Sequence, residues 1–287
     1  MGDPARPMEG RVCLVTGATS GIGAAASLAL ARLGGTVVLV GRDASRTARQ
    51  VERIRREAGG AEAETLLADL SSQAQVRQLA RDFQARFPRL DVLVNNAGGI
   101  FIRRQTTVDG LEMTLALNHL AGFLLTNLLL PGLLASPSGR VVNVASSAHH
   151  RGRIDFDDLQ RERSYDRLDA YAQSKLANVL FTRELARRLA GTRVTANAAD
   201  PGFVRTNLGA NDSWLRARIR NLVKRDLLSP AQGADVVVYL ASDPAVTGVS
   251  GRYFLRRAEV QSSGVSLDAE VAGRLWRVSE ALIGLSG

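Results

Sequence analysis

Short apolar runs alternate with helix-like segments along the first third of the chain. The apolar runs at 11–17, 36–41, 63–70 and 90–98 have the lengths of buried strands. The intervening segments at 21–34, 43–59 and 71–87 have the pattern of helices, and the last two begin beside a capping Asp or Ser. Strands and helices that alternate at this spacing predict βαβ units and a parallel sheet covered on both faces.

The alternation continues toward the C-terminus. It predicts helices at 107–134, 170–190 and 230–242, and strands at 140–145, 193–199 and 251–254. No linker rich in Pro, Gly or Ser divides the chain, and no internal repeat is visible. We therefore expect one α/β domain over residues 1–287, a doubly wound Rossmann fold with a parallel sheet of about seven strands and helices on both faces.

Residues 203–228 interrupt this rhythm. The segment follows a strand, yet it has the pattern of an arginine-rich, partly amphipathic insertion. We expect it to form a substrate lid; a surface for a partner and a solvated basic helix are the alternatives. The apolar positions of the expected lid are Trp214, Leu215, Ile219, Leu222 and Val223.

Composition narrows the classes of function. The net charge of +9 comes from arginines scattered along the expected helices, and aromatic residues are only 5%, so we expect no nucleic-acid partner. A single cysteine, Cys13, excludes a disulfide framework, and the adjacent His149 and His150 suit a loop better than a ligand pair, so we expect no metal. The longest apolar stretch, 123–135, is too short to span a bilayer, and the N-terminus lacks the apolar core of a signal peptide. We expect a soluble, cytoplasmic protein without a membrane span.

A glycine cluster stands between the first expected strand and the first expected helix. In TGATSGIG, Gly17, Gly21 and Gly23 are spaced G-x-x-x-G-x-G, not G-x-G-x-x-G. Glycines allow a tight turn and a close approach to a pyrophosphate, whose charge meets free N–H groups at the helix start. We expect a dinucleotide site here. The contacts that the same turn adds are Thr19, Ser20 and Ile22.

The end of the second expected strand indicates which dinucleotide binds. NAD-type sites usually place Asp or Glu there, but this strand ends in VGRD, with Arg42 at the position of an extra 2′-phosphate and Arg46 one turn later. Asp43 comes one residue late and suits a helix cap. We therefore expect NADPH (NADP+), although Arg42 could be one more arginine in an arginine-rich chain. Asp69, followed by Leu70, is well placed to bond the adenine amino group.

Four short motifs resemble those of the short-chain dehydrogenase/reductase family. They are TGATSGIG, NNAG at 95–98, YAQSK at 171–175 and DPG at 200–202, and their order and spacing match that family from residue 10 to about 255. Any one of them would be weak evidence, but the combination is specific. The resemblance implies a Rossmann fold and hydride transfer between a nicotinamide and a carbonyl or alcohol.

Tyr171 and Lys175 form the expected acid–base pair. Reduction of a carbonyl needs a proton delivered to the oxygen as negative charge develops there. A tyrosine has a reference pKa of about 10, so it needs a cation to stabilise its phenolate. Lys175 lies four residues after Tyr171 and therefore shares a helix face with it. The chain has only two lysines, Lys175 and Lys224, among 37 basic residues. The other three tyrosines have no lysine four residues on.

The resemblance implies the remaining site residues. Ser146 corresponds to the serine that holds the substrate oxygen, with Ser147 as the alternative, and Asn118 corresponds to the asparagine of the family's proton relay. Asp200 departs from relatives that often place histidine there. The coenzyme contacts that the resemblance adds are Asn95, Ala97, Gly98, Pro201, Gly202, Val204 and Thr206.

Longer segments narrow the resemblance to one branch. RVVNVASSAHHRGRIDFDDL and AYAQSKLANVLFTREL are similar to the retinol-dehydrogenase-like branch, which includes carbonyl reductases of bulky lipophilic ketones. We expect an NADPH-dependent reductase of a lipophilic ketone or aldehyde, of the kind found as anthracycline-type ketoreductases in antibiotic biosynthesis. A retinol- or steroid-type dehydrogenase and a catalytically silent NADPH-binding regulator are the alternatives. The substrate and the oligomeric state, for which a homodimer stays open, do not follow from the sequence.

Overall fold

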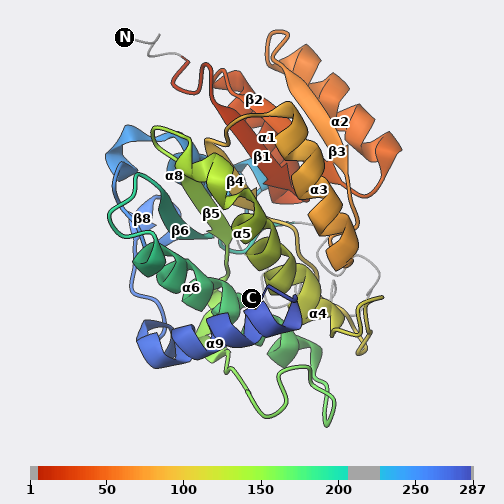
Figure 1. Ribbon diagram of the computed structural model, residues 1–287. Helices are drawn as coiled ribbons and strands as arrows, with labels where there is room; N and C mark the ends of the chain where they lie inside the picture. Colours follow the sequence, from red (N-terminus) through yellow and green to blue (C-terminus); the bar gives the residue numbers. More distant parts are fainter. Residues whose placement is uncertain (1–5, 206–226, 286–287) are drawn as a thin grey trace.

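Strands and helices alternate as expected in the computed structural model, which describes residues 6–205 and 227–285 (Figure 1). The strands are β1 Val12–Thr16, β2 Thr36–Gly41, β3 Ala63–Leu67, β4 Val92–Asn95, β5 Arg140–Val144, β6 Thr195–Asp200, β7 Tyr253–Leu255 and β8 Ala258–Glu259. The α-helices are α1 Gly21–Arg32, α2 Ala44–Glu57, α3 Gln73–Arg86, α4 Met113–Leu115, α5 Ala121–Leu134, α6 Arg167–Arg188, α8 Pro230–Ser242 and α9 Ala269–Leu282. Shorter elements are the π-helix η1 Ala116–Leu120 and the 3₁₀ helices η2 Ser147–Arg151, η3 Pro244–Val246 and η4 Gly264–Leu267.

One sheet runs through the molecule in the order β3-β2-β1-β4-β5-β6-β7-β8. The strands from β1 to β7 pair in parallel, which confirms the doubly wound α/β prediction. The two-residue β8 adds an eighth, antiparallel strand beside β7, too short to be recognised as a strand in the sequence. The chain order reverses between β1 and β4, and ligands of doubly wound folds bind in the crevice at the carboxyl ends of such strands.

Helices cover both faces of the sheet. On one face α1 packs against α2 and α8, over a core that includes Leu30, Leu39 and Val237. On the other face α3 packs against α5, and α9 lies across α6, with Leu125, Leu180 and Trp276 in the core (Figure 1). Burial on both faces explains why the strands have nearly continuous apolar runs in the sequence.

The structure corrects several expected boundaries. The third strand ends at Leu67, not at residue 70, and the helix expected from residue 107 begins at Met113. Both carboxylate oxygens of the buried Glu112 accept backbone N–H bonds from Thr114 and Leu115, each at 2.7 Å, and this cap sets the start of the helix. The amphipathic α9 near the C-terminus was not among the predicted helices.

One long apolar helical segment deserves comparison with a membrane span. Among the described residues, Met113–Leu134 is long and apolar enough to cross a bilayer by length and composition. However, 67% of its most apolar window is buried inside the molecule. The core helix of a water-soluble domain has the same properties, so this segment is weak evidence for a membrane span.

Candidate active site

The glycine turn between β1 and α1 has the geometry expected of a pyrophosphate site. Gly17 and Gly21 have φ values of 64° and 55°, in the region that favours glycine. A Cβ on Gly23 would lie 2.4 Å from both Asn96 Nδ2 and Gly17 O, so no side chain fits there. The capping residue Ser20 makes no side-chain bond to the first turn of α1, and that turn holds no acidic residue. The turn therefore leaves the positive end of α1 for an anion.

Asn96 and Thr16 hold this turn in place, and neither was among the predicted site residues. Asn96 Nδ2 donates to Thr16 O at 2.8 Å and to Gly17 O at 3.3 Å. Thr16 Oγ1 accepts from the N–H groups of Asn96 and Ala97 at 2.9 and 3.1 Å. The second asparagine of NNAG was the signal available in the sequence. These bonds join the ends of β1 and β4 across the crevice.

Arg42 and Arg46 lie exposed at the end of β2 and the start of α2. Asp43 caps α2, since its side chain accepts from Arg46 N at 3.0 Å and from Ser45 Oγ at 2.8 Å. These bonds hold the pKa of Asp43 below its usual value. The acidic group beside Arg42 is thus engaged in the cap, as the sequence predicted. Thr19 lies against this strand end, because a Cβ on Gly41 would be 2.6 Å from Thr19 Cγ2.

Tyr171 and Lys175 lie side by side on α6. Lys175 Nζ is 5.6 Å from the centre of the Tyr171 ring, and it donates to Val144 O at 2.9 Å. The lysine side chain is buried, with Lys175 only 5% exposed. Burial lowers the pKa of Lys175 to about 8.

The pKa of Tyr171 moves in the direction opposite to the expected one. Burial raises it to about 12, the hydrogen bond with Ser146 opposes the rise, and the charge of Asp200 adds to it. The lowering expected from Lys175 is not among the causes of this shift, and burial decides its direction. Tyr171 therefore keeps its proton at neutral pH, which suits a proton donor.

Ser146, not Ser147, meets Tyr171. Ser146 caps η2, with its Oγ accepting from Ala148 N at 3.2 Å, and its side chain hydrogen bonds with Tyr171. Ser147 is exposed. His149 is fully buried in η2, and its Nδ1 lies 2.8 Å from Ser146 O. His149 therefore lies in the short 3₁₀ turn after β5, and its buried ring supports Ser146.

Asn118 lies in the π-helix η1 and connects two parts of the site. Its Nδ2 donates to Ser174 Oγ at 2.9 Å and to Gly99 O at 3.0 Å, while its Oδ1 accepts from Gly99 N at 2.8 Å. A Cβ on Gly98 would lie 3.0 Å from Asn118 Oδ1 and 3.8 Å from Lys175 Nζ. A glycine at residue 98 therefore lets NNAG approach both side chains. Single turns of π-helix inside α-helices are frequent at functional sites.

The DPG segment follows β6 at the same edge of the sheet. Asp200 Oδ1 accepts from Gly202 N at 2.8 Å, and Gly202 has a φ of 74°. Pro201 is buried, and Val204 packs against Gly233 at the start of α8. Val204 pairs with Leu228, so the two ends of the expected lid lie together. The remaining expected residues of that region, Thr206, Trp214, Leu215, Ile219, Leu222 and Val223, lie outside the described residues.

Three expected coenzyme contacts have side chains with other partners. Asn95 Nδ2 donates to Thr126 Oγ1 and Asn143 Oδ1, both at 2.9 Å, so this side chain points toward α5 and β5. Leu70 belongs to the core, and Asp69 Oδ1 accepts from Ser71 N at 3.0 Å. Asp69 thus lies in a turn beyond β3, not at the end of the strand.

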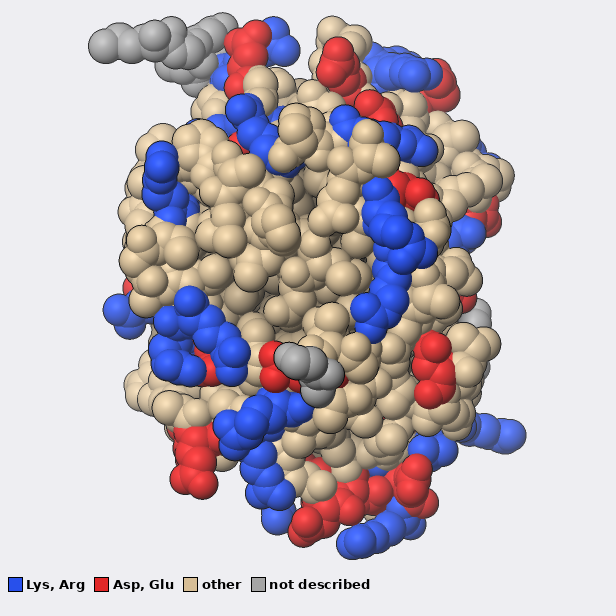
Figure 2. Space-filling view, in the orientation of Figure 1, with Lys and Arg blue, Asp and Glu red and all other residues tan. Residues whose placement is uncertain are grey.

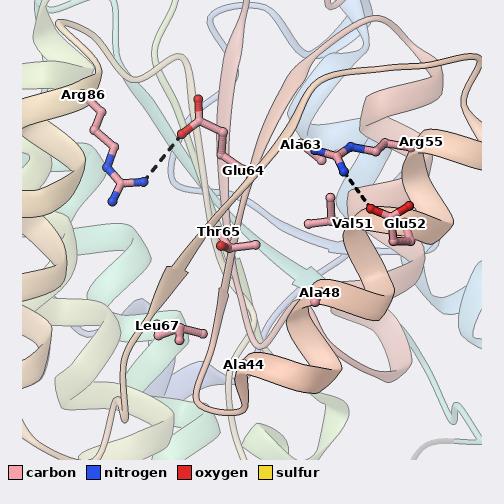
Figure 3. A pocket seen from close by; sticks show the side chains of 10 residues that line it. All are labelled: Ala44, Ala48, Val51, Glu52, Arg55, Ala63, Glu64, Thr65, Leu67 and Arg86. Atoms are coloured by element: carbon pink, nitrogen blue, oxygen red, sulfur yellow. Dashed lines mark hydrogen bonds and ion pairs between the residues drawn. The ribbon is translucent and has the colours of Figure 1, made fainter.

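A shallow hollow elsewhere on the surface lies along β3 and α2 (Figure 3). Its charged side chains pair with each other, Arg86 with Glu64 at 3.7 Å and Arg55 with Glu52 at 2.7 Å. It holds neither Tyr171 nor Lys175. We therefore place the site at the carboxyl ends of the strands and not here.

Surface charge is mixed on the face shown in Figure 2, where arginines stand among acidic side chains. Ion pairs also hold arginines elsewhere in the described residues, such as Arg187 with the buried Glu184 at 2.7 Å. No group of three or more His, Cys, Asp or Glu side chains that could hold a metal ion occurs within residues 6–205 and 227–285. The constellation that remains is the glycine turn with the Ser146, Tyr171 and Lys175 cluster.

Comparison with known proteins agrees with this constellation. The sequence profile of the short chain dehydrogenase family matches residues 11–214. The chain is 44% identical to retinol dehydrogenase 14 of Homo sapiens over 300 residues, which cover 99% of this chain and 89% of that protein. It is 43% identical to the proposed daunorubicin C-13 ketoreductase DnrU of Streptomyces sp. (strain C5), over 99% of this chain and 96% of that one. A proposed short chain dehydrogenase of Escherichia coli CFT073, solved with NADPH, superposes with a TM-score of 0.70 at 27% identity, over 89% of this chain and 100% of that one.

The chain belongs to the short-chain dehydrogenase/reductase family and is an oxidoreductase of its retinol-dehydrogenase-like branch. The resemblance seen in the four motifs is confirmed, and so is the Rossmann architecture.

Proposed function

We propose that this protein is an NADPH-dependent reductase of ketones or aldehydes on bulky lipophilic molecules. The observation that carries the proposal is the cluster of Ser146, Tyr171 and Lys175, which lies beside Gly98 of the NNAG segment. Bound NADPH would supply the hydride. The names of two relatives, a retinol dehydrogenase and a ketoreductase, support a lipophilic substrate.

Each residue of the cluster has a part in carbonyl reduction. Ser146 and the Tyr171 hydroxyl would hold the substrate oxygen through hydrogen bonds, which strengthen as negative charge develops on it. Tyr171, whose pKa is raised to about 12, carries the proton to be delivered to that oxygen. Lys175 supplies positive charge beside the phenol and would bond the ribose hydroxyls of the coenzyme. Asn118 holds Ser174 and the Gly98–Gly99 backbone beside this pair.

The coenzyme fits the residues at the β1–β2 side of the crevice. The Gly17, Gly21 and Gly23 turn and the open start of α1 suit the pyrophosphate. Arg42, exposed at the end of β2, suits the 2′-phosphate through charge-assisted hydrogen bonds. The structural relative solved with NADPH supports this choice.

Exposed apolar side chains close to site residues in the chain support a lipophilic substrate. Phe203, next to Gly202, is 64% exposed, and Ile102, four residues after Gly98, is 46% exposed. We propose that these two side chains contribute to one apolar binding surface, because contiguous exposed apolar patches mark such surfaces in soluble proteins. Since the long apolar helical segment is mostly buried, we propose that the enzyme acts in the cytoplasm on substrates that reach it from solution.

Ketone reduction by the purified protein tests the proposal. We expect NADPH oxidation with a panel of bulky ketones and aldehydes, and a kcat/KM at least about tenfold higher with NADPH than with NADH, because each charge-assisted bond contributes roughly 1.5–3 kcal/mol. Arg42→Ala should lose most of this preference and leave the NADH kinetics nearly unchanged. Arg49→Ala, also exposed but seven residues after Arg42 and one turn beyond Arg46 on α2, is the matched control. NADPH binding without turnover of any carbonyl would favour the regulator alternative, and equal use of both coenzymes would contradict the role of Arg42.

A further inference from the structure

A carboxylate is buried next to the catalytic cluster. Asp200, the last residue of β6, is 1% exposed. Its Oδ1 accepts from Gly202 N at 2.8 Å, and its Oδ2 accepts from the Tyr253 hydroxyl of β7. A buried carboxylate is costly unless its oxygens accept hydrogen bonds and an opposite charge lies near. Gly202 N and the Tyr253 hydroxyl supply the hydrogen bonds. The remaining question is which positive charge balances the carboxylate.

The sheet places Asp200 beside Lys175. Val144 and Ala199 are partners in the β5–β6 register, and Ala145 N donates to Ala199 O at 2.8 Å. Lys175 Nζ donates to Val144 O at 2.9 Å. Asp200 is the residue that follows Ala199, so its carboxylate lies one strand away from the carbonyl that holds the lysine. Negative charge there stabilises an ammonium and opposes a phenolate.

The ionisable groups around Asp200 come from three elements. Lys175 and Tyr171 face it from α6, Tyr253 from β7 and His149 from η2. The charge of Asp200 raises the pKa of each of these four groups. Among them only Lys175 carries a positive charge that can balance the carboxylate at neutral pH.

His149 stays neutral and links Asp200 to the serine. Its Nε2 accepts from Ser263 N at 3.1 Å, so the proton of the neutral ring is on Nδ1, which donates to Ser146 O. Burial lowers the pKa of His149. The His149 ring packs on the Tyr253 ring with 4.6 Å between centres, and Tyr253 bonds Asp200. The carboxylate is therefore held by Tyr253, whose ring is in turn held by His149.

We propose that Asp200 is a positioning residue of the reductase site, which fixes the 200–202 turn and keeps Lys175 an ammonium through its own negative charge. The kinetic part rests on the function proposed above, but the effect on Lys175 does not. With Asp200 present, burial of Lys175 leaves enough positive charge at neutral pH for Tyr171 and the ribose. Without it, the lysine loses its counter-charge and the phenol loses a neighbour that favours its protonated form.

Lysine NMR of the coenzyme-free protein tests this directly. The chain holds two lysines, so protein enriched with carbon-13 at lysine Cε gives two signals, and Lys224→Arg assigns them. In wild type we expect the Lys175 signal to titrate near its pKa of about 8. In Asp200→Asn, which can still accept from Gly202 N, the midpoint should fall by about one unit, since that is the usual size of an opposite-charge effect.

Tyr253→Phe is the matched control, because it removes a hydrogen bond to Asp200 and leaves the charge. Its Lys175 midpoint should stay at the wild-type value while its melting temperature falls. An unchanged midpoint in Asp200→Asn, or an equal fall in Tyr253→Phe, would overturn the proposal. Should Asp200→Asn fail to fold, Asp200→Ser keeps a small acceptor for Gly202 N and gives the same reading.

Kinetics then separate this proposal from the reductase function. In Asp200→Asn the loss of kcat/KM at alkaline pH should begin at a lower pH than in wild type. The difference in pH should equal the change in the Lys175 midpoint that NMR measures. A wild type that turns over no carbonyl contradicts the reductase function only, since the lysine titration still decides the role of Asp200.

Discussion

Lysine at residue 175 meets requirements that arginine does not. Its ammonium is buried, donates to Val144 O at 2.9 Å and lies 5.6 Å from the Tyr171 ring centre. The Gly98 backbone borders this ammonium, since a Cβ there would be 3.8 Å from Nζ, within van der Waals contact. A compact ammonium fits this space, whereas a planar guanidinium is longer and bulkier. This explains a lysine in a chain whose other basic residues, Lys224 apart, are arginines.

Lys175→Arg should fold normally and lose at least about 100-fold in kcat/KM for ketone reduction, because small displacements at a reacting centre cost about that much. Tyr171→Phe should lose as much, since it removes the proton. The measurement is ketone reduction by the purified variants with saturating NADPH. Lys224→Arg, at a position outside the described residues, is the control, and its rate should equal that of wild type. Activity of Lys175→Arg within about threefold of wild type would show that any cation suffices, against the expectation from its donor geometry.

Helix α9 is joined to the helices of the site through a buried histidine. His119, in η1, is 2% exposed; its Nε2 lies 3.0 Å from Ser279 Oγ of α9 and its Nδ1 lies 3.3 Å from Asn178 Oδ1 of α6. Trp276 of α9 packs on Phe123 of α5 with 4.8 Å between ring centres. The contact therefore depends on an uncharged imidazole among aromatic rings.

Acid should weaken this contact. Burial lowers the pKa of His119 from 6.5 to about 4. Between pH 6.5 and pH 4, therefore, the imidazole binds a proton in the unfolded chain but not in the folded one. The contribution of neutral His119 to the free energy of unfolding is fully present above pH 6.5 and is lost as the pH drops toward 4. We expect a loss on the order of 2–3 kcal/mol in the free energy of unfolding from this group.

Urea unfolding at neutral pH and near the lower end of this window measures the effect. His119→Gln should lose less stability between the two pH values than wild type. Ser279→Ala, which removes a partner and keeps the buried imidazole, should show the wild-type pH dependence at lower stability. Equal pH dependence in wild type and His119→Gln would assign the acid sensitivity to other groups.

The proposed coenzyme crevice lies at the point where the strand order reverses. Asn96 joins β4 to the glycine turn of β1, and the 200–202 turn follows β6, so the crevice is assembled from strands distant in sequence. A ligand that bridges these strand ends binds the folded domain and not the unfolded chain. Binding should therefore stabilise the entire domain by mass action.

NADPH at about 100 times its Kd should add roughly 2.7 kcal/mol and raise the melting temperature by about 5–10 °C. NADH at the same concentration should raise it less, because it has no phosphate for Arg42. Thermal unfolding of wild type and Arg42→Ala measures both shifts. If the two coenzymes stabilise wild type equally, Arg42 does not select the phosphate.

Local patterns in the sequence were sufficient to predict the class of fold and to propose Tyr171 and Lys175 as the catalytic pair. Alternating runs predict the parallel sheet because each strand and helix carries its own periodicity. Tyr171 and Lys175 are four residues apart on one helix, so their meeting required no knowledge of the rest of the chain. The cap of Asp43, the glycine turn and the choice of Ser146 over Ser147 likewise follow from short segments.

Contacts between distant residues decided the rest. Asn96 reaches Thr16 across 80 positions, and His119 reaches Ser279 across 160, so neither bond could be predicted from spacing along the chain. The pKa of Tyr171 depends on burial and on Asp200, and folding raised it where the sequence predicted lowering. Asp200 was only an unusual first residue of DPG until the β5–β6 register placed it beside Lys175. Periodicity reports which face of an element is buried, whereas the charges and donors that meet there depend on how all the elements pack.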